Sequence, residues 1–332
     1  MKPLYRNIFL LFGIIALSVM VACFPAGWEQ VAKNPNNVLI YLPGAIGIWL
    51  FIYILNALAF QMLVNTSDHD KHLPYRHAMK LTISGYAFSY TTPFGIGGSP
   101  YRVMELAKYI GTPHAISSVA LYAMMHVFSH FFLWATGIIV FVVAHFDKMT
   151  PWLWSLMGIY MLVFLFAIAF FTYSYKNGII AKLFHIFFFI PFLRKPCKRF
   201  YAKNIEAFNT IDGNIRFLYE HPRQLWGSLV CEYLGRVLNS FEFYFILLAL
   251  AIPANFADAL IILAFSSLMS NILFFFPMQI GAREGSLAII VSILYGSTPF
   301  GVTASIFTRI REIFWIILGV VLVKVGNKRI MR

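Results

Sequence analysis

Charged side chains are scarce in this chain. Only 12% of its 332 residues are Asp, Glu, Lys or Arg, whereas 60% are hydrophobic. An average soluble domain carries about 25% charged residues. Because the apolar residues extend along the whole chain, the composition excludes a sizeable soluble domain and predicts an all-α polytopic membrane protein.

Cysteine is also rare, with three residues, Cys23, Cys197 and Cys231. They fall in three different segments, so their spacing offers neither a disulfide framework nor a cluster of metal ligands. We therefore expect no disulfide, no metal site and no cofactor.

Acidic residues are half as frequent as basic ones, 13 against 26, which gives a formal net charge of +13. In a soluble protein this excess would suggest nucleic acid as a partner. Here the basic residues gather in a few loops, which is typical of cytoplasmic loops that face anionic lipid. We therefore expect membrane phospholipid as the partner and no nucleic acid.

Six apolar stretches are long enough to span a bilayer. They are residues 8–24, 38–64, 115–144, 152–175, 225–250 and 301–323. The first follows Lys2 and Arg6 in the manner of a signal sequence, but it lacks a small-residue cleavage site. We expect it to remain as an uncleaved first span.

The distribution of basic residues predicts the orientation. The segment 176–224 contains nine Lys or Arg residues, the tail 324–332 contains four and 65–80 contains three. The loops 25–37 and 145–151 contain one each. The positive-inside rule then puts both termini, 65–80 and 176–224 in the cytoplasm.

The basic segment 176–224 also contains an amphipathic pattern. Its apolar residues recur at intervals of three and four, which is one face of a helix. These residues are Tyr201, Ile205, Phe208, Ile211, Ile215 and Leu218. Because basic residues flank this face, we expect the helix to lie along the inner membrane surface.

Two further apolar regions, 78–111 and 257–296, are each broken by proline and glycine. The breaks are residues 93–98 (Pro-Phe-Gly-Ile-Gly-Gly) and 277–281 (Pro-Met-Gln-Ile-Gly). An arginine, a glutamate and a Gly-Thr-Pro or Gly-Ser-Thr-Pro turn follow each break. These are Arg102, Glu105 and 111–113 in the first copy, and Arg283, Glu284 and 296–299 in the second.

Each broken region predicts two half-length helices that form a hairpin. Inside a bilayer such a break is tolerated only where protein or a wet cavity satisfies the free backbone groups. With the orientation above, the first hairpin opens toward the cytoplasm and the second toward the outside. We therefore expect one domain, 1–332, of six full spans and two broken hairpins that either re-enter or cross fully, with inverted repeats at about 78–144 and 257–324.

The breaks are also the predicted substrate site. Ser99 and Pro100 are typical of a helix start, so a half-helix over 100–110 would aim its positive dipole end at the first break. The half-helix 282–295 would do the same at the second break, and a lipid phosphate could lie between Arg102 and Arg283. The predicted substrate-binding residues are Pro93, Gly97, Gly98, Ser99, Arg102, Glu105, Pro277, Gly281, Arg283, Glu284, Arg309 and Glu312. The alternative is that the glycines only permit close helix packing.

Further ionisable residues inside apolar spans predict a polar path for a headgroup. They are His126, His130, Glu232, Arg236 and Glu242. The alternative interpretation is a set of structural salt bridges. Glu232 and Arg236, four residues apart, can pair within one helix, and the residues at 309 and 312 share a face from which Arg311 points away.

His126 and His130 are also four residues apart, a spacing that can bind metal. No third ligand is evident, so a hydrogen-bonded pair between helices is the prediction, with proton coupling as the alternative. Asn56, Gln61 and Asn271 are expected to form hydrogen bonds between helices.

The two broken motifs resemble those of the lysylphosphatidylglycerol synthase transmembrane family. The resemblance rests on Thr92-Pro93 through Gly97-Gly98 with Arg102, and on Pro277 through Gly281-Ala282-Arg283-Glu284-Gly285. It implies a lipid-translocating domain in a bacterial plasma membrane. In bifunctional members this region moves aminoacylated phosphatidylglycerol to the outer leaflet, and a separate soluble domain attaches the amino acid.

Two further points bear on this resemblance, and the second is a departure from the family pattern. We expect no soluble aminoacyl-transferase domain after Arg332, so a lysyltransferase name would be inherited. The family commonly has an acidic residue directly after the first Gly-Gly, whereas this chain has Ser99-Pro100 and its nearest acid is Glu105. This puts in doubt how the first hairpin treats a headgroup amine.

Three functions are therefore compared. A lipid translocase moving an anionic or aminoacylated phospholipid is favoured, and we do not expect an enzyme. The alternatives are a membrane enzyme or accessory subunit acting on a lipid-linked substrate, and a transporter of a small solute. No ATP-binding motif is evident, so movement would be downhill or coupled to an ion gradient. Glycine-rich faces are compatible with a homodimer, and a separate lipid-modifying enzyme would be a further partner.

Overall fold

The structure is a computed structural model. It describes residues 35–66, 72–92, 97–174, 191–203, 205–273, 282–296 and 298–325. The predicted first span, 8–24, lies outside these residues. So do Pro93, Pro277 and Gly281, and with them much of both breaks.

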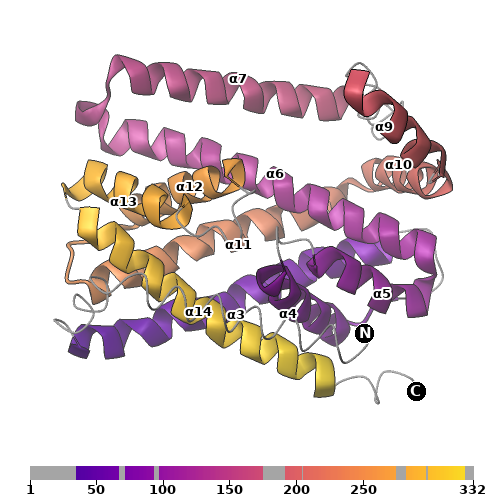
Figure 1. Ribbon diagram of the computed structural model, residues 1–332, viewed down its shortest axis with the longest axis horizontal. Coiled ribbons are helices and arrows are strands. Elements are labelled where there is room, and N and C mark those ends of the chain that lie inside the picture. Colours follow the sequence, from indigo (N-terminus) through magenta and orange to yellow (C-terminus); the bar gives the residue numbers. More distant parts are fainter. Residues whose placement is uncertain are drawn as a thin grey trace.

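The described residues form helices and no strand. The α-helices, with the labels of Figure 1, are α3 (Pro35–Thr66), α4 (Tyr75–Thr91), α5 (Gly98–Ile110), α6 (Thr112–Ala144), α7 (Pro151–Ser174), α9 (Pro191–Lys203), α10 (Ile205–Glu220), α11 (Pro222–Ala249), α12 (Phe256–Ile272), α13 (Ala282–Tyr295) and α14 (Thr298–Val325). A short 3-10 helix, η2 (Phe146–Lys148), joins α6 to α7. The five predicted spans that fall on described residues match α3, α6, α7, α11 and α14 within three residues at every end.

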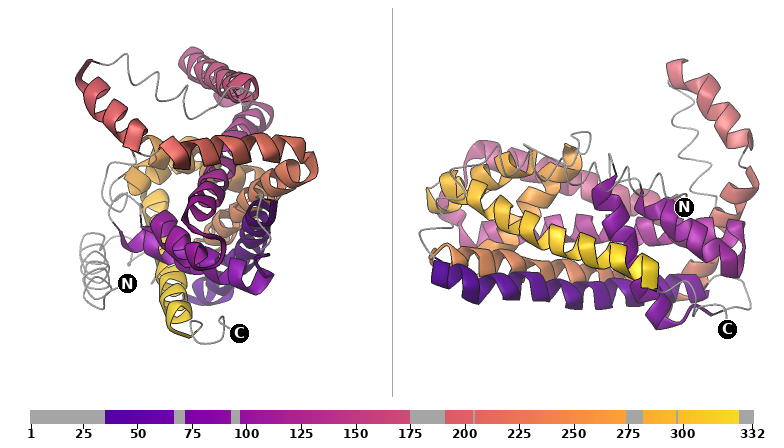
Figure 2. Two further views of the ribbon diagram at one scale, coloured as in Figure 1. Left: turned by 90° about the vertical axis from the view of Figure 1, so that its right-hand side faces the viewer. Right: turned by 60° about the horizontal axis from the view of Figure 1, so that its bottom comes forward.

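The long helices lie roughly along one axis of the molecule. α3 and α11 run side by side over most of their length (Figure 2) and form the most extensive helix pair. α6 and α14 run in opposite directions along the same axis (Figure 1). Two large apolar clusters lie between these helices, one around Phe60 and Leu106 and the other around Ile262 and Phe307.

Both broken regions form two short helices, as the sequence predicts. α4 and α5 come from the first region, and α12 and α13 come from the second. Each pair packs against the long helix that follows it, α5 on α6 and α13 on α14. The first member of each pair also packs on the long helix of the other half, since α4 contacts α14 and α12 contacts α6.

Glycines allow α12 to pack closely on α6, and α4 to pack closely on α14. Gly137 of α6 faces Ala264 of α12, and Gly319 of α14 faces Ala87 of α4. A methyl group on either glycine would overlap the alanine. Both helix pairs, α6–α12 and α14–α4, therefore use the same glycine–alanine contact.

The turns before the two long helices are also alike. Gly111 before α6 has a φ of 80° and Gly296 before α14 has a φ of 70°. Side chains with a Cβ rarely adopt such angles, so glycine is required at both places. At each turn the chain leaves a short helix and immediately enters a long one.

The outer surface of the bundle is apolar. In the described part of the chain, three helices are long and apolar enough to cross a membrane: Pro35–Thr66, Thr112–Ala144 and Pro151–Ala169. α11 and α14, with 28 residues each, have the length but carry buried charges. α7 exposes large side chains such as Leu162 and Phe166 to the surroundings, which fits a lipid-facing helix.

The amphipathic segment forms two helices instead of one, α9 and α10. The face of α10 is packed on the protein, because Ile211 is buried and Phe208 contacts the apolar cluster around Phe60. α10 contacts α6 and α11. These two residues therefore face the protein, while Ile205 is exposed.

We predict that Gly301→Ala destabilises the protein. The added methyl group would lie 2.5 Å from the Ala288 Cα and from the Leu287 carbonyl carbon, and backbone atoms of a packed helix cannot give way cheaply. Overpacking of this kind costs about 1–3 kcal/mol. The melting temperature of the purified protein in detergent should fall.

The matched control is Gly285→Ala in the neighbouring α13, where an added methyl group meets nothing within 4 Å. Alanine is the better helix former, so this variant should melt at or above the parent temperature. Equal melting of Gly301→Ala and the parent would contradict the close α13–α14 packing.

Candidate functional site

A cavity of about 250 Å³ lies inside the bundle, between α3, α4, α6, α11, α12, α13 and α14. Its lining is unusually polar for the interior of an apolar bundle. The charged and imidazole side chains in it are His126, His130, Glu232, Arg236, Glu242, Arg283, Arg311 and Glu312. Polar side chains in such surroundings are costly to bury, so they have partners or a function.

α11 forms one wall of the cavity with a single polar stripe. Glu232, Arg236, Asn239 and Glu242 recur at intervals of three and four residues and all line the cavity. Ten residues separate the two glutamates, which corresponds to about 15 Å along a helix axis. The stripe therefore presents a charged group to each end of the cavity.

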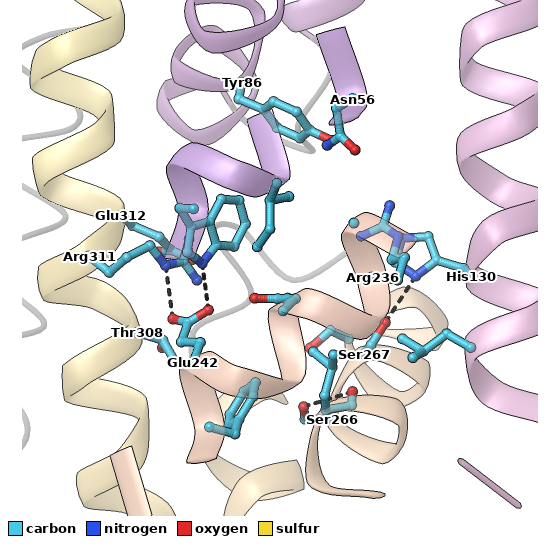
Figure 3. A pocket seen from close by; sticks show the side chains of 18 of the residues that line it. Asn56, Tyr86, His130, Arg236, Glu242, Ser266, Ser267, Thr308, Arg311 and Glu312 are labelled. Carbon is cyan, nitrogen blue, oxygen red and sulfur yellow. Dashed lines mark hydrogen bonds and ion pairs between the residues drawn. The ribbon is translucent and has the colours of Figure 1, made fainter. Parts of the chain in front are cut away.

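At one end, Arg311 of α14 pairs with Glu242. Arg311 Nε donates to Glu242 Oε1 at 2.9 Å, and Trp49 Nε1 donates to the other carboxylate oxygen at 2.7 Å. The guanidinium carbon lies 3.9 Å from the centre of a Trp49 ring. Figure 3 shows Arg311 and Glu242 facing each other across the cavity edge. Both oxygens of Glu242 are thus satisfied.

A second group of charges joins α13 to α14. Arg283 Nη1 pairs with Glu312 Oε1, and Arg309 Nη1 donates to Glu312 Oε2 at 3.2 Å. Arg309 also reaches Glu284, with Nη2 and Oε1 3.4 Å apart. Arg309 and Glu312 therefore share a face, as predicted. Arg283 and Glu312 line the cavity, and Arg309 and Glu284 are buried behind them.

At the other end, a histidine lies between two opposite charges. His126 Nδ1 is 2.8 Å from Glu232 Oε2, and Arg236 Nη2 is 2.6 Å from His126 Nε2. The direct Glu232–Arg236 pair of the alternative interpretation is not formed, because His126 from α6 lies between the two side chains. His130, one turn further along α6, is hydrogen-bonded to Ser267 of α12 (Figure 3). Both histidines therefore make the predicted hydrogen bonds between helices.

The cavity lining contains equal numbers of arginine and glutamate side chains. Three arginines (Arg236, Arg283, Arg311) face the cavity together with three glutamates (Glu232, Glu242, Glu312). The remaining walls supply hydroxyl and amide groups. These include Asn56, Tyr86, Tyr90, Ser266, Ser267, Ser270 and Thr308. Such a lining can receive both an anionic and a cationic part of one ligand.

Arg102 does not reach the cavity. Its buried guanidinium lies over the rings of Tyr86 and Tyr122, 5.3 and 5.2 Å from their centres, and Nη2 is 3.5 Å from the Thr82 carbonyl oxygen. Gly85 leaves the space for it, since a methyl group there would lie 2.5 Å from Arg102 Nε. The hypothesis that Arg102 and Arg283 face one chamber therefore needs correction, because Tyr86 stands between Arg102 and the cavity lining.

The start of α5 also differs from the prediction. The helix begins at Gly98 with Gly97 as its N-cap, so Ser99 lies inside the helix and does not cap it. Gly97 N donates to Thr92 Oγ1 at 2.8 Å. A methyl group at Gly97 or Gly98 would overlap α4. For these two glycines the structure favours the alternative of close helix packing.

Two further residues differ from their predictions, Glu105 as a substrate-binding residue and Asn271 as a link between helices. Glu105 accepts a hydrogen bond from Lys108 at 2.7 Å on the surface of α5 and does not line the cavity. Asn271 lines the cavity but donates to Ser267 O within its own helix, not to another helix. Asn56 does donate across helices, to Tyr86 Oη at 3.2 Å.

Several lining residues were absent from the predicted site. Asn239 could have been found, because it continues the three-and-four spacing of Glu232 and Arg236. The serines Ser266, Ser267 and Ser270 are an unusual cluster in an apolar helix and were also a usable signal. Trp49 and Tyr86 carry no such signal, since aromatic residues are common throughout the chain.

The chain matches the family model described as Lysylphosphatidylglycerol synthase TM region over residues 8–319. The chain belongs to this family. No curated protein matches it, and no solved structure matches it. Membership and the apolar helices make it a multi-pass membrane protein related to lipid modification or transport.

For this family member we predict that breaking the Arg311–Glu242 pair is strongly destabilising. Arg311→Met leaves the Glu242 carboxylate buried without its cation, and loss of one partner of a buried pair costs about 3–5 kcal/mol. Melting in detergent should show a large loss for Arg311→Met and a smaller one for the double variant Arg311→Met, Glu242→Leu.

The comparison pair is Lys108 and Glu105, which is close to the surface. Glu105→Gln should change stability by at most about 1 kcal/mol, because exposed ion pairs contribute little. If Arg311→Met melted like Glu105→Gln, the buried pair would not be formed as described.

Proposed function

We propose that the protein is a lipid translocase that moves an anionic or aminoacylated phospholipid between the leaflets of a bacterial plasma membrane. The observation that carries the proposal is the cavity, which holds three arginines and three glutamates inside a bundle with an apolar outer surface. A phospholipid needs both environments at once, a polar one for its headgroup and an apolar one for its chains.

The chemistry of the lining suits such a headgroup. Arginine recognises phosphate through two parallel hydrogen bonds, and carboxylates accept hydrogen bonds from ammonium or hydroxyl groups. Arg283 is better placed than Arg311, because both line the cavity but the Arg283 side chain is 16% exposed and that of Arg311 5%. A bound phosphate could replace Glu312 as the ion-pair partner of Arg283.

The architecture supports an inverted repeat of α4–α5–α6 and α12–α13–α14. Each unit has two short helices, a glycine turn of positive φ and a long helix. The long helices run in opposite directions (Figure 1), and each receives the first short helix of the other unit. Together with the six spans that the sequence predicts, this supports alternating access around a fixed central site.

The orientation follows from the basic residues. α9, α10 and the end of α14 lie at one end of the long axis, and the α6–α7 connection lies at the other (Figure 1). We infer that the end with α9 and α10 is cytoplasmic, because segment 176–224 carries nine basic residues. Both termini would then be cytoplasmic.

Cys197 can test this orientation. It is a free, half-buried cysteine on α9, whereas Cys231 is buried on α11. With Cys23 replaced by serine, a membrane-impermeant maleimide should label Cys197 only after the cell membrane is opened. Cys197→Ser should remove the label, and labelling in intact cells would contradict a cytoplasmic α9.

An enzyme acting on a lipid-linked substrate and a small-solute transporter are the alternative functions. An enzyme would change the chemical composition of the lipids, and a translocase would change only their distribution between leaflets. Mass spectrometry of lipids from cells with and without the gene distinguishes these two outcomes. A solute transporter would leave both unchanged.

We predict that Arg283→Ala slows lipid movement in proteoliposomes. The variant removes an arginine that could bind the phosphate, and a hydrogen bond to a charged group is worth about 1.5–3 kcal/mol. The transfer rate of labelled phosphatidylglycerol, measured by dithionite quenching of the outer leaflet, should fall by roughly 10- to 100-fold.

The matched control is Arg216→Ala on α10, whose side chain is 70% exposed. It removes the same charge outside the cavity and should move lipid at the parent rate. If the parent moved no lipid, the translocase proposal would fail. If Arg283→Ala moved lipid as fast as the parent, the assignment of Arg283 would fail.

A further inference from the structure

Glu232 differs from the other glutamates around the cavity. Glu242, Glu284 and Glu312 each have an arginine within ion-pair distance. Within the described part of the chain, Glu232 has only His126 at that distance, and its Oε1 has no hydrogen-bond partner there. A buried carboxylate with one oxygen bare carries an uncompensated desolvation cost.

The bare oxygen is closed to ordinary ligands. Glu232 is 1% exposed and Oε1 is fully buried, so nothing as large as a water molecule touches it in this conformation. The Tyr122 hydroxyl of α6 is likewise buried without a hydrogen-bond partner among the described residues. The species that fits is a proton, which neutralises the carboxylate and gives it an O–H donor.

Arg236 determines which ring nitrogen of His126 carries the proton. Its Nη2 lies 2.6 Å from Nε2 and 3.0 Å from Nδ1 of the imidazole, and its Nε donates to Ser129 Oγ at 3.3 Å. A guanidinium only donates, so Nε2 acts as the acceptor, and the network then assigns the ring proton to Nδ1, which donates to Glu232. The positive charge of Arg236 thus reaches Glu232 through a neutral ring.

Arg236 also lines the cavity, where a headgroup phosphate would meet it. A phosphate that pairs with Arg236 withdraws the cation from His126 and adds a negative charge near Glu232. Both changes favour a proton on the Glu232–His126 pair. When the phosphate leaves, Arg236 returns and the proton is released.

We propose that binding of a phosphate-bearing anion in the cavity is linked to uptake of one proton at Glu232. The step is carboxylate plus proton to carboxylic acid, with the proton taken from water in the cavity and returned to water on release. No electron moves and no other reactant is needed. Since the link would couple lipid movement to a proton gradient, the inference rests on the proposed function.

Other ionisable groups surround this site and enter its pH dependence. On the elements that pack around Glu232 they are His126, His130 and Tyr122 of α6, Tyr86 of α4, Arg102 of α5, and Cys231 and Arg236 of α11. Arg102 lies over the Tyr86 and Tyr122 rings and is absent from the lining, so a ligand would not withdraw it. Arg236 is the cation that contacts His126 and also lines the cavity, so it connects Glu232 to a bound ligand.

The test measures protons directly. Purified protein in weakly buffered detergent solution is mixed with phosphatidylglycerol, and a pH indicator reports protons taken up while a separate assay measures bound lipid. We expect uptake of up to one proton per bound lipid, by linkage. Glu232→Gln should lose the uptake, and Glu220→Gln, the same change at an exposed site, should keep it.

The outcomes separate the two proposals. Absence of lipid binding would defeat the proposed function, whereas lipid binding without proton uptake overturns the proton site alone. Uptake that persists in Glu232→Gln also overturns it. Glycerol phosphate, used in a parallel arm, shows whether a phosphate without lipid chains is sufficient. Uptake with either ligand supports the site, and the pattern assigns it to lipid or to phosphate in general.

A second measurement needs no variant, in case Glu232→Gln fails to fold. Linkage is reciprocal, so a proton bound with the lipid must raise lipid affinity as the pH falls. Between about pH 5 and 8, where phosphatidylglycerol keeps its charge, affinity of the parent should increase by up to about tenfold per pH unit. An affinity that does not change with pH overturns the inference.

Discussion

Burial of charge in an apolar bundle is the constraint on which this structure depends. An unpaired ion in such surroundings is far costlier than a paired one. The chain meets this cost by pairing arginines and glutamates across helices, with Arg311 of α14 on Glu242 of α11 and Arg283 of α13 on Glu312 of α14. The residues that could bind a headgroup are therefore also the residues that join the helices.

This double use has a mechanical consequence. A ligand that takes an arginine must release a glutamate, and the released glutamate needs another partner or a proton. The helices concerned include α13, a short helix of 14 residues that meets α14 at the positive-φ turn of Gly296. Exchange of partners at such a junction can favour a second arrangement of the helices, because a ligand shifts an equilibrium only through contacts that differ between its states.

The sequence predicted the helices better than the site. Hydropathy and the Pro and Gly breaks are local signals, and they located the described spans within three residues and α13 at its observed bounds. Ionisable residues in an apolar span are conspicuous, and of those predicted, Arg283 and Glu312 line the cavity whereas Arg309 is buried behind them. Arg102 was predicted to face the cavity but lies over the Tyr86 and Tyr122 rings, a contact with other helices that no pattern within α5 could show.

The remaining failures have a different origin. Spacing along α11 correctly put Glu232 and Arg236 on one face, but no pattern within α11 could show that His126 of α6 would lie between them. That insertion changes the chemistry. A direct pair would fix both charges, whereas His126 holds Glu232 only through a hydrogen bond from an uncharged ring and leaves Arg236 able to turn toward the cavity. The bare oxygen of Glu232 follows from tertiary packing, and so does the asymmetry between its end of the cavity and the fully paired Glu242 end.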